Sequence, residues 1–145
     1  MQSLTLLETR LVDHGQSLTH ARKLIFLLFT NQPYISVDQV LSLIGTNVNR
    51  ATIYRTIALF EGLDILSRLY VTRDTYLLSL REPFASHHHV FLCTHCFEVT
   101  TFSEPAFLPD ALSAASKKIE GSVYSHELVL RGVCARCHTG AQTKT

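Results

Sequence analysis

The sequence predicts an α+β protein with a helical N-terminal half and a strand-rich C-terminal half. Residues 1–65 carry apolar side chains at helical spacing, whereas residues 81–145 read mainly as strands with one helix between them. A polar hairpin follows the helices, which is the element order of a winged helix-turn-helix domain. Two Cys-x-x-Cys pairs in the second half predict a four-cysteine zinc site.

Two helices are expected near the N-terminus. The first covers residues 4–14, with leucines along one stripe, and ends near Gly15. Thr19 is the expected N-cap of the second helix. Because residues 24–29 are all apolar, we expect this second helix to be buried nearly all round.

Two further helices have clear start and end signals. Ser36, with Gln39 three residues later, forms a capping-box pattern, and Gly45 is the expected end of that third helix. Asn49 is the expected N-cap of the fourth helix, which runs to about Gly62. The fourth helix therefore takes the place of a recognition helix, and strands at residues 65–71 and 75–80 supply the wing.

The outward side of the fourth helix is predicted to contact DNA. It is expected to carry groups that bond to bases and phosphates, namely Arg50, Thr52, Tyr54, Arg55 and Thr56. The alternative is that Tyr54 packs against the wing and that Arg50 and Arg55 are solvated surface charges. The formal net charge of +1 does not by itself indicate a nucleic-acid binder.

The second half begins near Pro83. We expect residues 1–82 to form the winged-helix domain, a hinge at about residues 81–86, and residues 83–145 to form the second domain. In that domain the pattern predicts short strands at residues 90–92 and 99–102, a helix from residue 109 or 110 to residue 119, and a long final strand at residues 123–133.

All four cysteines fall in the two pairs, Cys93 with Cys96 and Cys134 with Cys137. The alternative to zinc is two disulfides or four buried thiols. Because the chain begins without an export leader, we expect a reducing cytoplasm, where thiolates bind metal more often than they form disulfides. The longest apolar run is far shorter than the ~20 residues that a membrane span needs, so no membrane partner is expected.

A second metal site is predicted from histidines. Strand alternation places His87 and His89 on one face, and His126 arrives from the final strand. Three imidazoles suit Zn, Fe, Co or Ni, whereas the role of His88 stays open. The alternative is a set of exposed histidines that bind nothing.

In this order, several motifs resemble the ferric-uptake-regulator (Fur) family of bacterial metal-responsive repressors. They are Leu18-Thr19 with Arg22, Ser36, Ala51 to Thr56, His87 to His89 before Cys93-Thr94-His95-Cys96, and His126 to Cys134. The resemblance implies a winged helix, a hinge and an α/β dimerisation domain with structural zinc on the two cysteine pairs. It also implies a homodimer that binds an AT-rich inverted repeat when loaded with metal, with Tyr54 and Arg55 touching the DNA.

The chain departs from the family pattern at the hinge metal site. The corresponding positions are expected to be Tyr34, Leu77 or Leu78, Val90 and Thr101, and none is a good ligand. The hinge site is therefore expected to be absent or rebuilt.

The family's other site matches His87, His89 and His126, with the usual acidic ligand replaced near Leu108. Glu104, Asp110 or Glu127 could supply an oxygen, and spacing does not choose among them.

These patterns predict a metal-dependent repressor with one structural Zn²⁺ and a second, regulatory divalent metal. The ligand types favour Zn²⁺ over Fe²⁺ for the second metal, as in a zinc-uptake-regulator (Zur) type of the family. One alternative is a DNA-binding regulator that has only structural zinc and senses nothing. A more distant alternative is a three-histidine zinc enzyme, for which the sequence offers no partnered general base.

Overall fold

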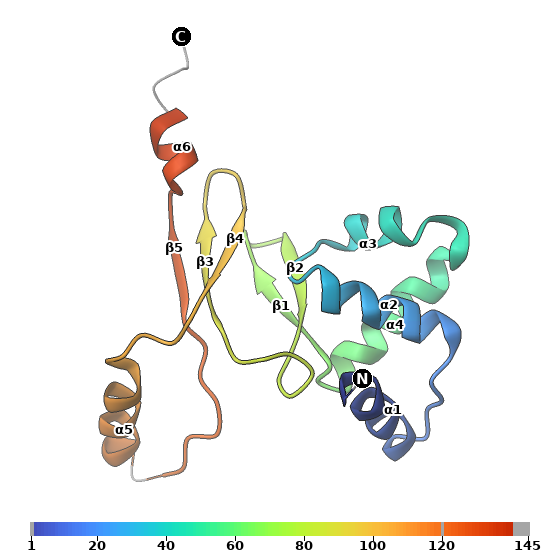
Figure 1. Cartoon of the computed structure of the whole chain (residues 1–145), viewed down its shortest axis with the longest axis horizontal. Coiled ribbons are helices and arrows are strands. Elements are labelled where there is room, and N and C mark those ends of the chain that lie inside the picture. The colour runs from blue at the N-terminus through green and yellow to red at the C-terminus, as the bar shows by residue number, and fades with distance from the viewer. Residues whose placement is uncertain (1, 120, 141–145) are drawn as a thin grey trace. The chain divides into compact units, whose positions relative to one another are not determined.

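The computed structural model describes residues 2–119 and 121–140, and it divides the chain into two compact units, Met1–His87 and His88–Thr145. Figure 1 labels the helices and strands of both units. The hinge predicted at residues 81–86 stays a prediction.

The first unit contains the four expected helices and the hairpin, together with a short 3-10 helix. Its elements are α1 (Gln2–Asp13), α2 (His20–Asn31), α3 (Val37–Ile44), η1 (Gly45–Asn47), α4 (Arg50–Gly62), β1 (Leu66–Tyr70) and β2 (Tyr76–Leu80). The expected caps are present, because the Thr19 side chain accepts from the Arg22 N–H and Ser36 forms a capping box with Gln39. The two strands pair antiparallel, as expected for a wing.

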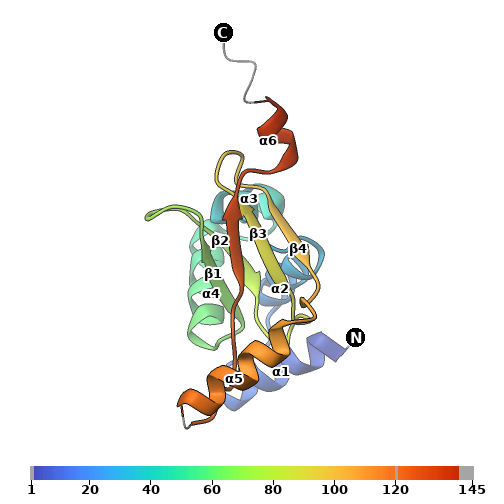
Figure 2. The ribbon, with the colours of Figure 1, turned by 90° about the vertical axis from the view of Figure 1, so that its left-hand side faces the viewer.

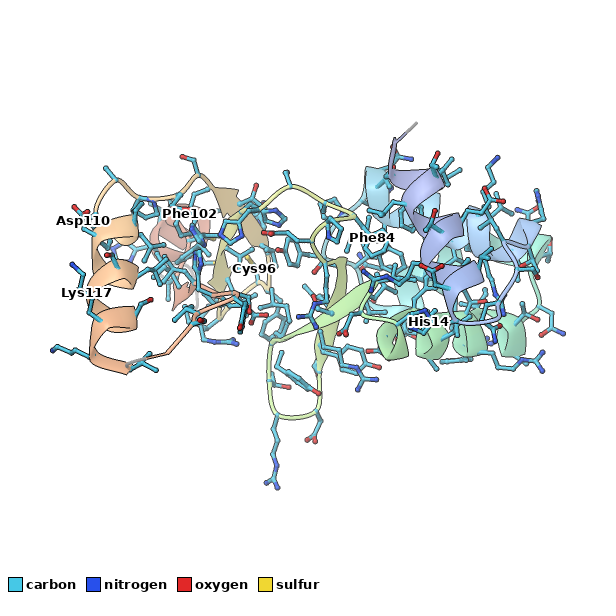
Figure 3. The ribbon with its side chains drawn as sticks, turned by 90° about the horizontal axis from the view of Figure 1, so that it is seen from below. His14, Phe84, Cys96, Phe102, Asp110 and Lys117 are labelled. Carbon is cyan, nitrogen blue, oxygen red and sulfur yellow. The ribbon has the colours of Figure 1, made fainter. Side chains whose placement is uncertain are left out.

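The core of the first unit is built on aromatic contacts. The Phe26 ring packs edge-on against Phe60 and Phe84, with centroids 6.5 and 6.0 Å apart. Phe84, labelled in Figure 3, lies within the segment expected to be a hinge, yet its side chain is only 4% exposed. The Arg10 guanidinium lies 5.4 Å from the centroid of the Phe84 ring. The segment after β2 is therefore anchored in this core.

The second unit is a three-stranded sheet with two helices. Its elements are β3 (His89–Cys93), β4 (Val99–Phe102), α5 (Leu108–Ile119), β5 (Val129–Gly132) and α6 (Ala135–Gly140). The strand order is β4-β3-β5, as Figure 2 shows, with β3 antiparallel to β4 and parallel to β5. The parallel pair needs a crossover connection, and that connection contains α5.

The predicted final strand is wrong in length. Strand pairing begins only where Val129 lies opposite Val90, and residues 123–128 are irregular. Because β3 begins at His89 and runs parallel to β5, residues 123–128 have no partner strand. The six-residue helix α6 was not predicted. Among the described residues, no helix is both long and apolar enough to cross a membrane.

Candidate metal centres and DNA-contact helix

The four cysteines meet where β3 and β5 end side by side. β3 delivers Cys93, and the turn to β4 carries Cys96. The backbone N–H of Thr94 donates to the Gly132 carbonyl oxygen at 2.8 Å, which holds this turn beside the end of β5. Cys134 and Cys137 follow at the start of α6. The four sulfur atoms all lie within 4.8 Å of one another.

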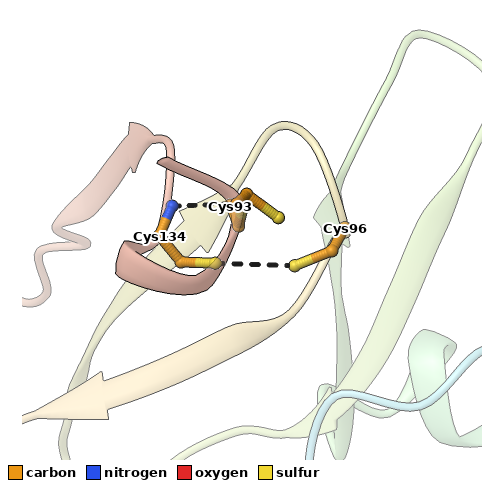
Figure 4. Close-up of side chains that lie close together, drawn as sticks. Cys93, Cys96 and Cys134 are labelled. Atoms are coloured by element: carbon orange, nitrogen blue, oxygen red, sulfur yellow. Dashed lines mark hydrogen bonds between the residues drawn. The ribbon is translucent and has the colours of Figure 1, made fainter. Parts of the chain in front are cut away.

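The sulfur geometry fits a tetrahedral zinc ion. The Sγ atoms of Cys96 and Cys134 are 3.8 Å apart (Figure 4). Two sulfurs that each lie ~2.3 Å from one tetrahedral ion are separated by about 3.8 Å. The four thiols are free, and they form a closed set of the kind that structural zinc takes.

The surroundings of these thiols change their pKa values in a way that favours cation binding. The N–H groups of Cys96 and Cys134 lower the pKa of the Cys93 thiol to about 6, and the second of them lies 3.4 Å from the Cys93 sulfur. The neighbouring sulfurs of Cys96 and Cys134 raise the pKa of Cys137 to about 12. The raised pKa means that deprotonating Cys137 beside these sulfurs costs free energy. A bound dication would remove that cost, because it stabilises all four thiolates at once.

A charged pair connects the two cysteine turns. Arg136 lies between Cys134 and Cys137 on α6, and its Nη2 is 2.6 Å from Oε2 of Glu98. The same Nη2 lies 3.7 Å from Sγ of Cys96. The Cys96 sulfur and the Glu98 carboxylate together raise the pKa of Arg136, so this guanidinium stays charged.

A second cluster combines histidines with one carboxylate. His87, His89, Glu104 and His126 each offer a ligand atom, and these atoms all lie within 4.8 Å of one another. His89 begins β3 and is 1% exposed, and its ring centroid is 5.3 Å from that of His126. Three imidazoles and a carboxylate form a donor set that suits Zn²⁺ or Fe²⁺.

Of the three carboxylates that could supply an oxygen, Glu104 is the one that lies with the histidines. Glu104 comes two residues after β4 ends, and β4 is held to β3 by the pairing of Phe102 with His89. Asp110 and Glu127 do not belong to the cluster, and neither does His88. His126 joins it from the irregular segment before β5, not from a strand.

His87 has a carboxylate partner outside the cluster. Its Nδ1 contacts Oε1 of Glu82. Histidines that ligate a metal commonly donate their other ring N–H to a carboxylate. Because Glu82 occupies Nδ1, Nε2 is the ring nitrogen of His87 that would bind a metal.

In the second unit, the positions that correspond to the family's hinge metal site are Val90 and Thr101, and neither is a good metal ligand. Val90 lies directly opposite Thr101 in the β3–β4 ladder. In the first unit Leu78 is fully buried and bridges to Ile35. Val90 and Leu78 are therefore buried apolar residues.

Helix α4 presents most of the predicted DNA-contacting side chains to solvent. Arg50, Tyr54 and Arg55 are exposed, and Thr52 is half-buried. The Asn49 side chain accepts from the Thr52 N–H at 3.2 Å, which fixes the start of the helix. Thr56, by contrast, is buried, and its expected outward position was wrong because it lies three residues after Ile53 on the inward face.

Comparisons with known proteins agree with this arrangement. The model of the ferric uptake regulator family matches residues 13–131. The ferric uptake regulation protein of Bordetella parapertussis is 31% identical over 139 residues, covering 92% of this chain and 97% of that protein. The peroxide-responsive repressor PerR of Staphylococcus saprophyticus is 24% identical over 134 residues, covering 89% and 87%.

A solved structure has the same fold. The Helicobacter pylori ferric uptake regulator, which has three functional metal binding sites, superposes with a TM-score of 0.76 at 18% identity, covering 94% of this chain and 92% of that one. With the match to the family model, this agreement identifies the chain as a member of the ferric uptake regulator family, whose proteins are metal-dependent transcriptional regulators that bind DNA as dimers and are not enzymes.

Proposed function

We propose that this protein is a repressor whose DNA binding is switched on by a divalent metal held by His87, His89, Glu104 and His126. The observation that carries the proposal is that these four donors come from three separate segments of the chain and still converge. Such a cluster forms only when β3, β4 and the segment before β5 are held in one arrangement. When bound, the cation would cross-link these segments and stabilise that arrangement.

We favour Zn²⁺ as the sensed metal, with Fe²⁺ as the alternative. Three imidazoles suit zinc at least as well as iron, and only one carboxylate belongs to the cluster. The relatives include ferric regulators and a peroxide-responsive repressor, so the zinc-uptake (Zur) type rests on the donor set alone. The four cysteines would hold a separate structural Zn²⁺.

In this proposal the two recognition helices of a homodimer bind successive major grooves of an AT-rich inverted repeat. Tyr54 and Arg55 would contact base edges, and Arg50 and Thr52 would contact the backbone near the N-terminus of α4. Half-sites one helical turn apart, ~34 Å, fit a two-fold dimer. The operator lies on the chromosome, so we place the regulator in the cytoplasm.

The second unit supplies the dimer contact in this proposal. Helix α5 has no buried residue in the single chain, and several of the unit's large apolar side chains are exposed: Phe107, Ile119, Val123, Tyr124, Leu130 and Val133. Exposed apolar side chains gathered in one small unit are typical of a protein interface. We accordingly assign residues 1–82 to DNA binding and residues 83–145 to dimerisation and metal binding, with a hinge at residues 81–86.

The test combines metal content with DNA affinity. The purified protein is stripped with a mild chelator and titrated with Zn²⁺, Fe²⁺ and Mn²⁺ while binding to an AT-rich palindromic promoter fragment is followed. One tightly held zinc per chain, with a second metal that switches DNA binding on, supports the proposal and names the sensed metal. DNA binding that is unchanged with only the tight zinc present would instead establish the alternative, a regulator that senses no metal.

A further inference from the structure

The four cysteine ligands differ in how they are protected. Cys93 is fully buried, and backbone N–H groups surround its sulfur. Cys134 and Cys137 are half-buried, whereas Cys96 is exposed. A chelator or an electrophile that removes zinc must first reach one sulfur, and Cys96 is the most exposed of the four cysteine residues. Cys96 is therefore the ligand that such a reagent reaches most readily.

Arg136 lies beside the sulfur of Cys96. Its Nη2 lies 3.7 Å from the Cys96 sulfur, within the range of an N–H···S hydrogen bond, and the Glu98 carboxylate holds the same nitrogen at 2.6 Å. Arg136 belongs to the second cysteine turn, whereas Cys96 and Glu98 belong to the first. One guanidinium therefore joins both turns next to the exposed thiolate.

We propose that Arg136, anchored by Glu98, protects the Cys96 thiolate and thereby slows the loss of zinc from the four-cysteine site. The inference rests on the zinc occupancy proposed above. Arg136 acts through Cys96 and is a positioning residue, since it contributes no ligand atom. Its donated hydrogen bond withdraws electron density from the sulfur, which lowers the sulfur's nucleophilicity, and its bulk occupies one direction of approach.

The expected effect is kinetic more than structural. Arg136 and Glu98 are 72% and 51% exposed, and an ion pair this exposed to solvent contributes little to folding. Removing the pair should therefore leave the unit folded. Partners of metal ligands nevertheless change metal affinity by about 10- to 100-fold, and a change of that size in the zinc-release rate is the expected signature.

The experiment uses the full-length zinc-loaded dimer. Zinc transfer to a chromophoric chelator is timed for the wild type and for Arg136→Ala, Arg136→Lys and Glu98→Gln. The same proteins are treated with limiting N-ethylmaleimide, and peptide mass spectrometry follows the alkylation of each cysteine over time. Lys117→Ala is the matched control, because it removes a positive charge from α5 of the same unit.

Arg136→Ala should release zinc about 10- to 100-fold faster, with Cys96 alkylated faster than in the wild type. Lysine keeps the charge but lacks the rigid planar guanidinium, so Arg136→Lys should be intermediate, and Lys117→Ala should match the wild type. Glu98→Gln leaves the sequence of α6 unaltered and provides the test if Arg136→Ala does not fold. Zinc-loaded variants with wild-type rates of zinc release and of Cys96 alkylation would overturn the inference. A wild-type protein purified without zinc would overturn the zinc assignment itself.

Discussion

Replacing Phe84 with alanine should destabilise the first unit and weaken the regulatory metal site together. The Phe84 side chain is 4% exposed, packs edge-on against Phe26 and carries the Arg10 guanidinium over its face. Deleting a buried phenylalanine ring costs about 3–5 kcal/mol, a figure that already includes these contacts. Because a domain is stabilised by only about 5–15 kcal/mol, the loss is a large share of the total.

Differential scanning calorimetry is the suitable assay, since the chain contains no tryptophan to report unfolding. For a unit of this size, each kcal/mol shifts the melting temperature by roughly 4–8 °C, so the transition of the first unit should fall by at least about 12 °C. Val12→Ala is the matched control. That side chain is 61% exposed on helix α1 of the same unit, and its truncation should change stability by less than about 0.5 kcal/mol.

The same variant should bind the regulatory metal more weakly. Phe84 anchors the segment in which Glu82 contacts His87, and loosening the segment removes the partner that orients this ligand. Equilibrium dialysis should show a loss of second-metal affinity with the cysteine-bound zinc retained. A Phe84→Ala protein that melts within about 1 kcal/mol of the wild type would refute the assignment of Phe84 as an anchor.

Three other substitutions test the remaining assignments. Tyr54→Ala should weaken operator binding by about 1–3 kcal/mol in a fluorescence-anisotropy titration with zinc content unchanged, whereas Val12→Ala, an exposed side chain of α1, should not. Glu104→Ala should reduce second-metal affinity at least about tenfold, and Glu127→Ala should leave it unaltered; equal effects would exclude Glu104 as the ligand. Cys93→Ser should lose the structural zinc and unfold the second unit, because metal binding supplies folding free energy; a dimeric, cooperatively melting Cys93→Ser protein would contradict this.

Features set by local sequence could be predicted, and those set by distant contacts could not. The caps at Thr19 and Ser36 depend on residues within one helical turn, so their patterns identify them directly. The cysteine cluster was equally clear, since two Cys-x-x-Cys turns have few other uses in a reduced protein. Phe84 was missed because one aromatic residue beside a proline carries no periodic signal, and only the folded core shows its burial.

The limits of strand patterns explain the errors in the second unit. The apolar residues of segment 123–128 suggested strand, but a strand exists only where a neighbour offers backbone partners, and β3 begins at His89. Arg136 gave no sequence signal beyond its place between two cysteines. Its contact with Glu98 depends on how the two turns meet.

The position of Glu104 shows how the proposed regulatory site differs from the family pattern and still brings four donors together. The residue expected to supply an acid, near Leu108, starts helix α5 and has no carboxylate. Glu104 lies instead in the loop after β4, and that strand is registered against β3 by the Phe102–His89 pair. One ladder therefore fixes the distance between His89 and the loop that carries Glu104. The ligand residue can occupy a different position in such a loop without altering the sheet, because loops tolerate changes in sequence and length. The same sheet pairs Val90 with Thr101, where a second set of ligands would be expected. Neither residue of that pair is a good ligand, so we expect a single regulatory metal per chain, held by the proposed site of three histidines and Glu104.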